Sequence, residues 1–527
     1  MTLSYSVLAA SFLATYVVYL LARSIFRALR RRRLAKIHGC RPPPQLPSPF
    51  FGIPAFFDLV RAAKRKQVVQ HIEKIVARCG TTFERTILGY SQIATIDPEN
   101  IKAMLATQFN DFALGTRHEI FYPLLGDGIF TLDGAGWSHS RALLRPQFTR
   151  DQVADIGMLS SHVDHFLAAL PKDRTAFDIQ ELLFRLTLDS ATEFLFGEST
   201  HSLSPNFVAG SGPLANCGGE EGFAHAFNLA QEYLVDRGRA QALYWLINPP
   251  KFRQAVKLVH EVVDYYVDQA IKKSQQLEKK DSSGSDNKRY VFLEAVARDT
   301  QDRKVLRDQM LNILLAGRDT TASLLSSSFF YLARHPRVWT RLREEIIRAF
   351  PPTESADTIT IERLREVKYL RYFLNEVLRL LPPVSANTRW ATVDTTLPRG
   401  GGPDGQSPIF VEKGKRVAYF VSLMHRRKDI WGPDANEFRP ERWEENAKRG
   451  WEYLPFNGGP RICLGQQYAL TEASYVLVRL LQRFDTLENA QPEMVEPVIK
   501  FNLTISHDEG VRIRLYNSKE VESGSHG

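Results

Sequence analysis

The chain has 527 residues, 44% of them hydrophobic, which is enough to bury the core of one large domain or of two smaller ones. Residues 1–41 hold eight basic side chains and no acidic one, so they account for eight of the nine net positive charges. This local excess gives no support to a nucleic-acid-binding function. The four cysteines form no C-x-x-C pair, which argues against a disulfide framework or a zinc module.

Residues 1–22 contain no charged side chain and are predicted to form an apolar helix of about the length that crosses a bilayer. Basic residues follow this run, from Arg23 to Lys36, instead of preceding it, and no small-residue cleavage site is present. That order predicts an uncleaved anchor with its basic flank in the cytosol, with a peripheral amphipathic helix as the alternative. The proline-rich residues 41–49 are predicted to form a stiff linker. The expected domains are an anchor (1–22), a basic flank and linker (23–49) and a main domain (50–527).

The next part of the chain mixes helical patterns with short β-rich runs at 82–87 and 93–96, which predicts a small sheet beside helices. Residues 109–136 are rich in aromatic residues and glycine, lack helical periodicity and are predicted to form a long loop. A helix is expected from Trp137, with Arg141 one turn later on the same face. Further helices are expected at 152–170, 179–196, 221–238 and 252–280.

The longest expected helix covers residues 306–335 and carries Asp319, Thr320 and Thr321 inside an otherwise apolar stretch. Polar groups in such a place cost free energy unless a partner or bound water uses them. A mid-helix hydroxyl can also bond its own backbone and open a groove, and Gly317 removes a side chain beside it. The pattern is consistent with a groove for a small ligand, and an ordinary polar stripe is the alternative.

Two further helices are expected at 336–350 and 361–381, and the second places Glu376 and Arg379 one turn apart on one face. An exposed pair of this kind is common and stabilises little by itself. The remaining expected elements are β-rich runs at 409–412 and 417–421, a helix at 464–484 and a β-hairpin at 499–515 with its turn at 507–510.

Cys463 lies in the glycine-rich segment FNGGPRICLG (456–465), directly before an apolar helical run. Unpaired N–H groups at the start of a helix favour negative charge, so the thiol is expected to ionise readily. The thiolate is the form of cysteine that binds metal ions. Cys463 is therefore a candidate metal ligand, and a buried structural cysteine is the alternative.

Four motifs, in this order along the chain, resemble those of the cytochromes P-450: A-G-x-D-T-T at 316–321, E-x-x-R at 376–379, F-R-P-E-R-W at 438–443 and F-x-x-G-x-R-x-C-x-G at 456–465. The resemblance covers essentially the whole chain. It implies a mainly α fold with smaller β-sheets (α+β), in which a triangular helical body follows an N-terminal transmembrane helix. The longer segments 425–443 and 456–476 resemble the fungal alkane and fatty-acid hydroxylases of P-450 family 52.

In that family the cysteine at the place of Cys463 ligates a haem iron and pushes electron density onto it, which favours cleavage of the O–O bond. The resemblance places Phe456 over the thiolate and Gly317 where dioxygen needs room. It makes Asp319 and Thr320 the acid and the alcohol that relay protons. It also assigns haem propionate contacts to Trp137, Arg141, Arg389 and Arg461, and a buried three-way salt bridge to Glu376, Arg379 and Arg442. We expect the substrate pocket to have an apolar lining made by Phe121, Tyr122, Leu124, Leu125 and Val384.

The implied activity is that of a membrane-bound haem-thiolate monooxygenase that uses O2 to hydroxylate an aliphatic C–H bond, expected at the terminal carbon of a fatty acid or alkane. No segment resembles a flavin or nicotinamide domain, so NADPH electrons are expected from a separate NADPH–cytochrome P-450 reductase. Ala316 stands where animal ω-hydroxylases carry a glutamate that can esterify the haem, so haem b is expected to be bound non-covalently. The protein is expected to be a monomer that crosses the endoplasmic reticulum membrane once, with a cytosolic body. Its expected partners are the reductase, membrane lipid and an apolar small molecule, without nucleic acid.

Three alternatives remain open. Filamentous fungi use relatives of these enzymes on polyketides and other secondary metabolites, and the expected apolar pocket suits those substrates as well. A haem-thiolate protein that binds or senses without oxygenating is the second alternative, against which the intact Asp319–Thr320 pair argues. The third is a membrane-anchored interaction protein without a cofactor.

Overall fold

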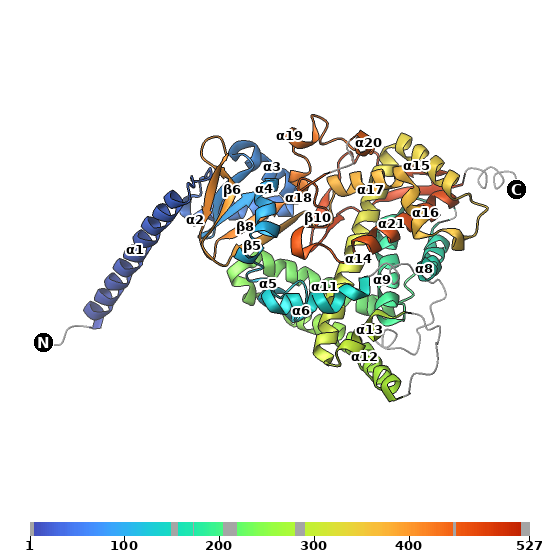
Figure 1. Ribbon diagram of the computed structural model, residues 1–527, viewed down its shortest axis with the longest axis horizontal. Coiled ribbons are helices and arrows are strands. Elements are labelled where there is room, and N and C mark those ends of the chain that lie inside the picture. The colour runs from blue at the N-terminus through green and yellow to red at the C-terminus, as the bar shows by residue number, and fades with distance from the viewer. Residues whose placement is uncertain are drawn as a thin grey trace.

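The computed structural model describes residues 5–148, 156–171, 173–203, 219–279, 290–445 and 449–517. These residues form a triangular, mainly helical body, and one long helix projects from the corner that holds most of the strands (Figure 1). The expected α+β architecture is therefore confirmed.

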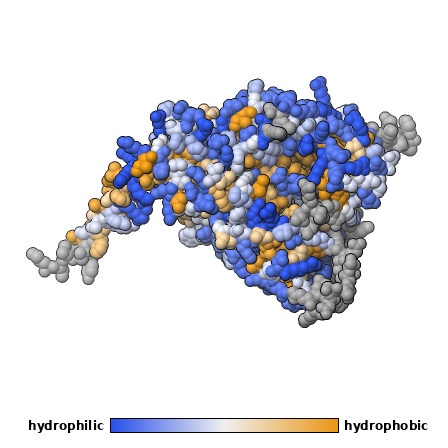
Figure 2. All heavy atoms as spheres, in the orientation of Figure 1, coloured by the Kyte–Doolittle hydropathy of each residue, from blue (hydrophilic) through white to orange (hydrophobic). Residues whose placement is uncertain are grey.

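The projecting helix α1 runs Tyr5–Ile37, so it continues through the basic flank beyond the apolar residues 1–22. Its apolar side chains are exposed along its length (Figure 2). Among the described helices, α1 is the one that is long and apolar enough to span a bilayer, over Ala9–Ile37. Its basic end contacts the body, where Arg30 pairs with Asp394 at 2.6 Å.

The proline-rich linker pairs with β7 of a small sheet and with the edge strand β1 of the main sheet. The Arg41 N–H donates to the Pro408 carbonyl at 2.8 Å, and the Leu46 N–H donates to the Glu84 carbonyl at 2.9 Å. The Glu84 N–H in turn donates to the Pro44 carbonyl at 2.8 Å. A sheet edge suits prolines because they lack an N–H to donate. Main-chain hydrogen bonds therefore hold the linker to the body.

The main sheet has five strands in the order β1-β2-β8-β5-β3, in which β2 and β8 pair in parallel and the other pairs are antiparallel. The register places Phe83 opposite Ala94 and Ile93 opposite Val417, and these four side chains are buried. Three small sheets are made by β6 with β7, by β10 with β11, and by β4, β12 and β9. The strands are β1 (Thr82–Ile87), β2 (Tyr90–Thr95), β3 (Phe112–Ala113), β4 (Phe177–Asp178), β5 (Ala386–Ala391), β6 (Thr395–Gly401), β7 (Ser407–Val411), β8 (Arg416–Phe420), β9 (Thr486–Asn489), β10 (Ile499–Phe501), β11 (Ile505–His507) and β12 (Arg512–Tyr516).

Helix α14 (Arg303–Arg334) runs through the body and is buried along most of its length. Helices α5, α9, α12, α15, α17 and α21 pack against it. A helix surrounded in this way is buried over most of its surface, which is why its sequence shows no single apolar stripe. The other α-helices are α2 (Pro49–Lys64), α3 (Val68–Cys79), α4 (Pro98–Lys102), α5 (Arg117–Leu125), α6 (Gly134–Leu144), α8 (Ile156–Ala169), α9 (Ile179–Phe196), α11 (Gly219–Ala240), α12 (Pro250–Lys279), α13 (Phe292–Asp299), α15 (Pro336–Ala349), α16 (Ile361–Glu366), α17 (Lys368–Leu380), α18 (Val421–Met424), α19 (Lys428–Trp431), α20 (Arg442–Glu445) and α21 (Gln466–Arg483).

The loop expected at 109–136 is the least accurate prediction, because this segment contains the helix α5 and the start of α6. Helix α5 has nine residues and a proline inside it, Pro123, so its sequence shows no clear helical period. Contacts with α11, α12 and α14 hold it in place. Tertiary packing has therefore overridden a weak local signal.

The C-terminal hairpin also differs from its prediction. The turn expected at 507–510 is present, with the Gly510 N–H donating to the His507 carbonyl at 3.2 Å, but the hairpin itself is closed at 502–504, between β10 and β11. Strand β12 pairs with β4 and β9 instead of with β10. The helix expected at 361–381 is interrupted at Val367, and the expected helix start at 152 lies outside the described residues.

Candidate active site

The segment before α21 turns tightly around Cys463. Its N–H donates to the Phe456 carbonyl at 3.0 Å, and the Ile462 N–H donates to the Gly459 carbonyl at 3.0 Å. Gly459 has φ +68°, and a Cβ there would overlap the Leu105 carbonyl oxygen. Both the positive φ and the close approach require glycine at this position.

The Cys463 thiol opens on a pocket of about 380 Å³ that Leu464 also lines, together with Arg145, Pro146 and Phe148. Burial raises the pKa of the thiol above its ordinary value, whereas the Gly465 N–H and the Arg141 guanidinium lower it. The Gly465 N–H at the start of α21 and Arg141 thus act in the direction that the sequence predicts, against the larger effect of burial. A metal cation would supply the missing positive charge, because thiols that coordinate metal ions lose their proton.

Guanidinium groups gather beside this loop. Arg461 donates from Nη2 to Asp133 at 2.7 Å and to the Leu132 carbonyl at 2.9 Å, and its guanidinium lies 4.5 Å from the centre of the Trp137 ring. Arg141, one turn after Trp137 on α6, donates to the Ile462 carbonyl at 3.0 Å. The structure thus brings Trp137, Arg141 and Arg461 together next to Cys463.

Two more arginines complete the group, and one of them was missed from the sequence. Arg389 on β5 is buried, and Arg117 at the start of α5 donates to Asn387 on the same strand. Burial, followed by the neighbouring charges of Arg389 and Arg461, lowers the pKa of Arg117 to about 9. A single arginine in a predicted loop carries no signal that could have identified Arg117.

The net charge of the four arginines shows whether the site suits the haem propionates. The pKa of Arg461 falls to about 10, first by burial and then through Arg389 and Arg141, while Asp133 opposes the shift. Arg389 is buried and the other three arginines are half-buried, so four guanidinium groups beside one facing carboxylate leave an excess of positive charge that is costly unless anions balance it. Two haem propionates would balance it, and Cys463 would meet the iron. The residues present therefore fit haem.

Helix α14 contacts the same segment as Arg461, because Asn312 accepts from the Phe130 N–H at 3.1 Å while the Leu132 carbonyl accepts from Arg461. Ala316, Gly317 and Thr320 are only partly buried, whereas most of their neighbours on the helix are buried. The Thr320 hydroxyl donates to the Ala316 carbonyl at 2.7 Å, which is the back-bonding that can open a helix. A Cβ at Gly317 would meet the Ala191 side chain at 3.9 Å, so helix packing does not by itself require glycine there.

Asp319 is buried, and this burial raises the pKa of its carboxyl group. Arg318, at 3.4 Å, and a hydrogen bond with Gln231 of α11 oppose the shift. Arg318 also donates to Asn228, one turn before Gln231 on α11. No local pattern indicates that α11 supplies these partners, because they lie far from Asp319 along the chain.

Glu472 on α21 is a second buried carboxyl group beside α14, and the sequence analysis did not predict it. Burial raises the pKa of Glu472 on α21 to about 7, while Ser190, His162 and Thr321 lower it. Ser190 on α9 donates to its carboxylate at 2.5 Å. The sequence offers only an isolated acidic residue in an amphipathic helix, which is normally a solvent-exposed position.

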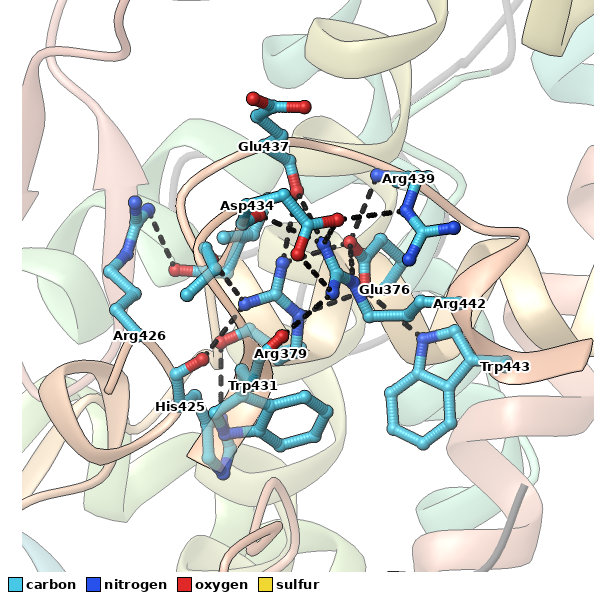
Figure 3. A network of polar contacts seen from close by, with 12 residues as sticks. Glu376, Arg379, His425, Arg426, Trp431, Asp434, Glu437, Arg439, Arg442 and Trp443 are labelled. Carbon is cyan, nitrogen blue, oxygen red and sulfur yellow. Dashed lines mark hydrogen bonds and ion pairs between the residues drawn. The ribbon is translucent and has the colours of Figure 1, made fainter. Parts of the chain in front are cut away.

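Glu376 is fully buried at the centre of a polar network (Figure 3). Arg379 donates to its two carboxylate oxygens at 2.9 and 2.8 Å, and Arg442 donates to one of them at 3.0 Å. The Trp443 indole and the Arg439 N–H complete its hydrogen bonds, at 3.1 and 2.9 Å. The structure therefore places the three residues of the expected salt bridge in contact.

The five residues expected in the substrate pocket do not share one environment. Leu124 and Leu125 are completely buried in a hydrophobic core, against which Phe121 packs. Tyr122 is 41% exposed beneath the Lys304 ammonium group, and Val384 is 39% exposed. Their contact with a substrate stays a prediction.

Comparison with known proteins agrees with this site. A family model described as Cytochrome P450 matches residues 42–508, which include every site residue discussed above. The chain belongs to the cytochrome P450 family. It is 47% identical to Cytochrome P450 52A13 of Debaryomyces hansenii over 97% of both chains, and 50% identical to Cytochrome P450 52A3-B of Candida maltosa over 92% of this chain and 93% of that one. Cytochrome P450 52A4 of Candida maltosa is 53% identical over 82% and 80% of the two chains.

These similarities confirm the resemblance to P450 family 52. The protein is a P450 monooxygenase, and membership of the family implies haem with a cysteine-ligated iron, O2 and electrons derived from NAD(P)H.

Proposed function

We propose that this P450 hydroxylates a long aliphatic chain, a fatty acid or an alkane, at its terminal carbon. The observation that carries the reaction type is the group of arginines at the Cys463 loop, which Arg141 joins by donating to the Ile462 carbonyl, and the polar residues of α14 support it. The substrate class rests on the similarity to family 52 over almost the whole chain.

Within this proposal, Cys463 holds the haem iron and the five residues Trp137, Arg117, Arg141, Arg389 and Arg461 hold the propionates. Bound haem supplies the iron at which dioxygen is activated. Phe456 accepts the Cys463 N–H and fixes the loop. Ala316 offers no carboxylate to the haem, so the haem is bound non-covalently.

The residues of α14 move protons in this proposal. Burial raises the pKa of the Asp319 carboxyl group, which favours its protonated form. Thr320 lies next to it on the partly exposed face, where its hydroxyl can pass a proton on to the open side of α14. Gly317 leaves this face free of a side chain, so a small molecule can approach the hydroxyl.

The body is held at a membrane by α1, whose basic end follows the apolar span as in anchors that keep their C-terminal side in the cytosol. We place the protein in the endoplasmic reticulum membrane as a single-pass monomer. Its electrons come from NADPH–cytochrome P450 reductase, which docks on the side of the Cys463 loop.

The test is turnover of the full-length protein in lipid vesicles with the reductase, NADPH and a panel of fatty acids and alkanes. We expect NADPH consumption coupled to products hydroxylated at the terminal carbon. Absence of oxygenated lipid products and of coupled NADPH use would contradict the proposal. Product from a polyketide panel alone would favour a role in secondary metabolism instead.

Replacing Thr320 with alanine is expected to lower product formed per NADPH by roughly tenfold or more, because positioned proton transfer contributes about 10²–10⁴-fold to the steps that need it. The missing product should appear as hydrogen peroxide. The haem absorbance should not change, because the Thr320 hydroxyl bonds only its own helix in the described structure. Thr320→Ser is the control and should retain most of the coupling; unchanged coupling in the alanine variant would exclude a role in proton delivery.

A further inference from the structure

Helix α5 is held to the body through its backbone carbonyl groups. Pro123 has no N–H, so the Glu119 carbonyl one turn earlier lacks its usual intrahelical donor. Arg237 of α11 fills this place, since its Nη2 donates to the Glu119 carbonyl at 3.0 Å and its Nε donates to the Ile120 carbonyl at 3.0 Å. The start of α5 is therefore fastened to α11 by one guanidinium group.

Side chains of two other helices bind the backbone carbonyls at the C-terminal end of α5. The ring of His260 on α12 lies 2.9 Å from the Leu124 carbonyl, and Asn312 of α14 donates to the Leu125 carbonyl at 2.9 Å. The last carbonyls of a helix have no intrahelical donor, so these side chains satisfy groups that would otherwise be unpaired. Three different helices thus fix the position of α5.

Arg237 also reaches the connector between α11 and α12, the 3-10 helix η4 (Gln241–Leu246) and Ile247. Its Nη1 donates to the Ile247 carbonyl at 3.0 Å and lies 3.5 Å from the Tyr244 carbonyl. The guanidinium stacks 5.1 Å from the centre of the Tyr244 ring and 5.8 Å from that of Phe252. One side chain therefore joins the η4 connector to α5.

The environment of Arg237 is unusual for an arginine. Its side chain is 5% exposed, and its contacts in the described part of the chain are main-chain carbonyls and aromatic rings. Arg239, two residues later, is exposed, pairs with Asp236 at 3.1 Å and donates to the Phe501 carbonyl at 2.9 Å, and it has no contact with α5 among the described residues. Burial of a guanidinium is tolerated only where its N–H groups are satisfied, which the convergence of four carbonyls achieves.

Helix α5 is also part of the wall around the site. Its first residue, Arg117, belongs to the arginine group, and its last carbonyl is bound by Asn312, one turn before Ala316 on the open face of α14. The η4 connector lies on the outer side and exposes Trp245 and Leu246, each 62% exposed. If the substrate pocket lies along α5, as the proposed function has it, a shift of α5 relative to the connector would move the wall of that pocket.

We propose that Arg237 is a positioning residue that fixes α5 against the η4 connector and thereby determines which carbon of a long apolar chain is oxidised. The substrate part of this proposal rests on the proposed function. The fixing of α5 does not, because it follows from the hydrogen bonds of the resting protein.

The test compares Arg237→Met, which keeps the length of the side chain and removes its donors, with Arg239→Met as the matched control. Amide hydrogen exchange of residues 119–126 is measured in the haem-loaded protein without substrate. We expect exchange at least about tenfold faster in Arg237→Met, because the Glu119 and Ile120 carbonyls lose their donor and α5 loses its link to the connector, and no change in Arg239→Met. Equal exchange in wild type and Arg237→Met would overturn the proposal.

A second measurement follows the distribution of hydroxylated carbons on one fatty acid. Arg237→Met is expected to shift product from the terminal carbon to internal carbons by about tenfold, with normal haem absorbance, and an unchanged distribution would refute the role in specificity. If wild type makes no lipid product, the proposed function fails while the exchange experiment still decides the role of Arg237.

The Pro123→Ala variant distinguishes a specific link between Arg237 and α5 from a general loss of stability. The alanine N–H can donate to the Glu119 carbonyl, so loss of Arg237 should then speed exchange less than it does beside Pro123. Equal effects in both backgrounds would contradict the proposed fastening. If Arg237→Met yields no holoprotein, Arg237→Lys, which keeps the charge and a single donor group, takes its place in the same comparisons.

Discussion

Replacing Glu376 with alanine is expected to prevent a stable haem-loaded fold. The substitution removes the acceptor of both Arg379 and Arg442, which are buried and lie beside each other (Figure 3). Breaking a buried ion pair by removing one partner costs about 3–5 kcal/mol, which is a large part of the ~5–15 kcal/mol that stabilises a typical domain. The measurement is the yield of haem-loaded protein together with its midpoint of thermal unfolding.

Glu444→Ala is the matched control for this prediction. Glu444 pairs with Arg341 at 2.5 Å, but both side chains are about 40% exposed. Exposed pairs contribute about 1 kcal/mol or less, so this variant should fold and bind haem as the wild type does. Comparable losses in the two variants would mean that burial of the Glu376 network is not what stabilises the segment.

Replacing Gly459 with alanine should be almost as damaging, because it changes the loop that carries Cys463. The new methyl group would overlap the Leu105 carbonyl, and the φ of +68° is unfavourable for any residue with a Cβ. Overpacking costs about 1–3 kcal/mol and a left-handed conformation about 1–2 kcal/mol more. The loop should move, and haem content after purification should fall severalfold.

Gly465→Ala separates this effect from a general sensitivity of the loop. Gly465 has φ −86°, and a Cβ there would meet the Phe148 ring at 3.6 Å, an ordinary contact. We expect haem content close to that of the wild type. If Gly459→Ala retained haem as well as Gly465→Ala does, the geometric requirement at Gly459 would be wrong.

The parts of the site that could be predicted from the sequence are those whose chemistry depends on adjacent residues. The loop around Cys463 and the polar residues of α14 each occupy a short run of consecutive positions. Polar and ionisable residues are costly in such apolar surroundings, so their presence there points to a functional role. The long helix itself was predicted within three residues at its start and one at its end.

What could not be predicted depends on side chains that meet only in three dimensions. Arg117 joins the arginine group from a helix that looked like a loop, and Gln231 reaches Asp319 from α11. Glu472 looks like a surface residue until α9 and α14 cover it. The pairing of β12 with β9 and β4 likewise depends on strands distant in sequence, which no local pattern specifies.

The central claim is that Cys463 is the thiolate ligand of a haem in this protein. The most direct measurement is the absorption spectrum of the reduced, CO-treated full-length protein, recorded for wild type and for Cys463→Ser. We predict the red-shifted Soret band typical of thiolate ligation in the wild type and its loss in the serine variant. A wild-type spectrum without that band, or a band that persists in Cys463→Ser, would contradict the claim.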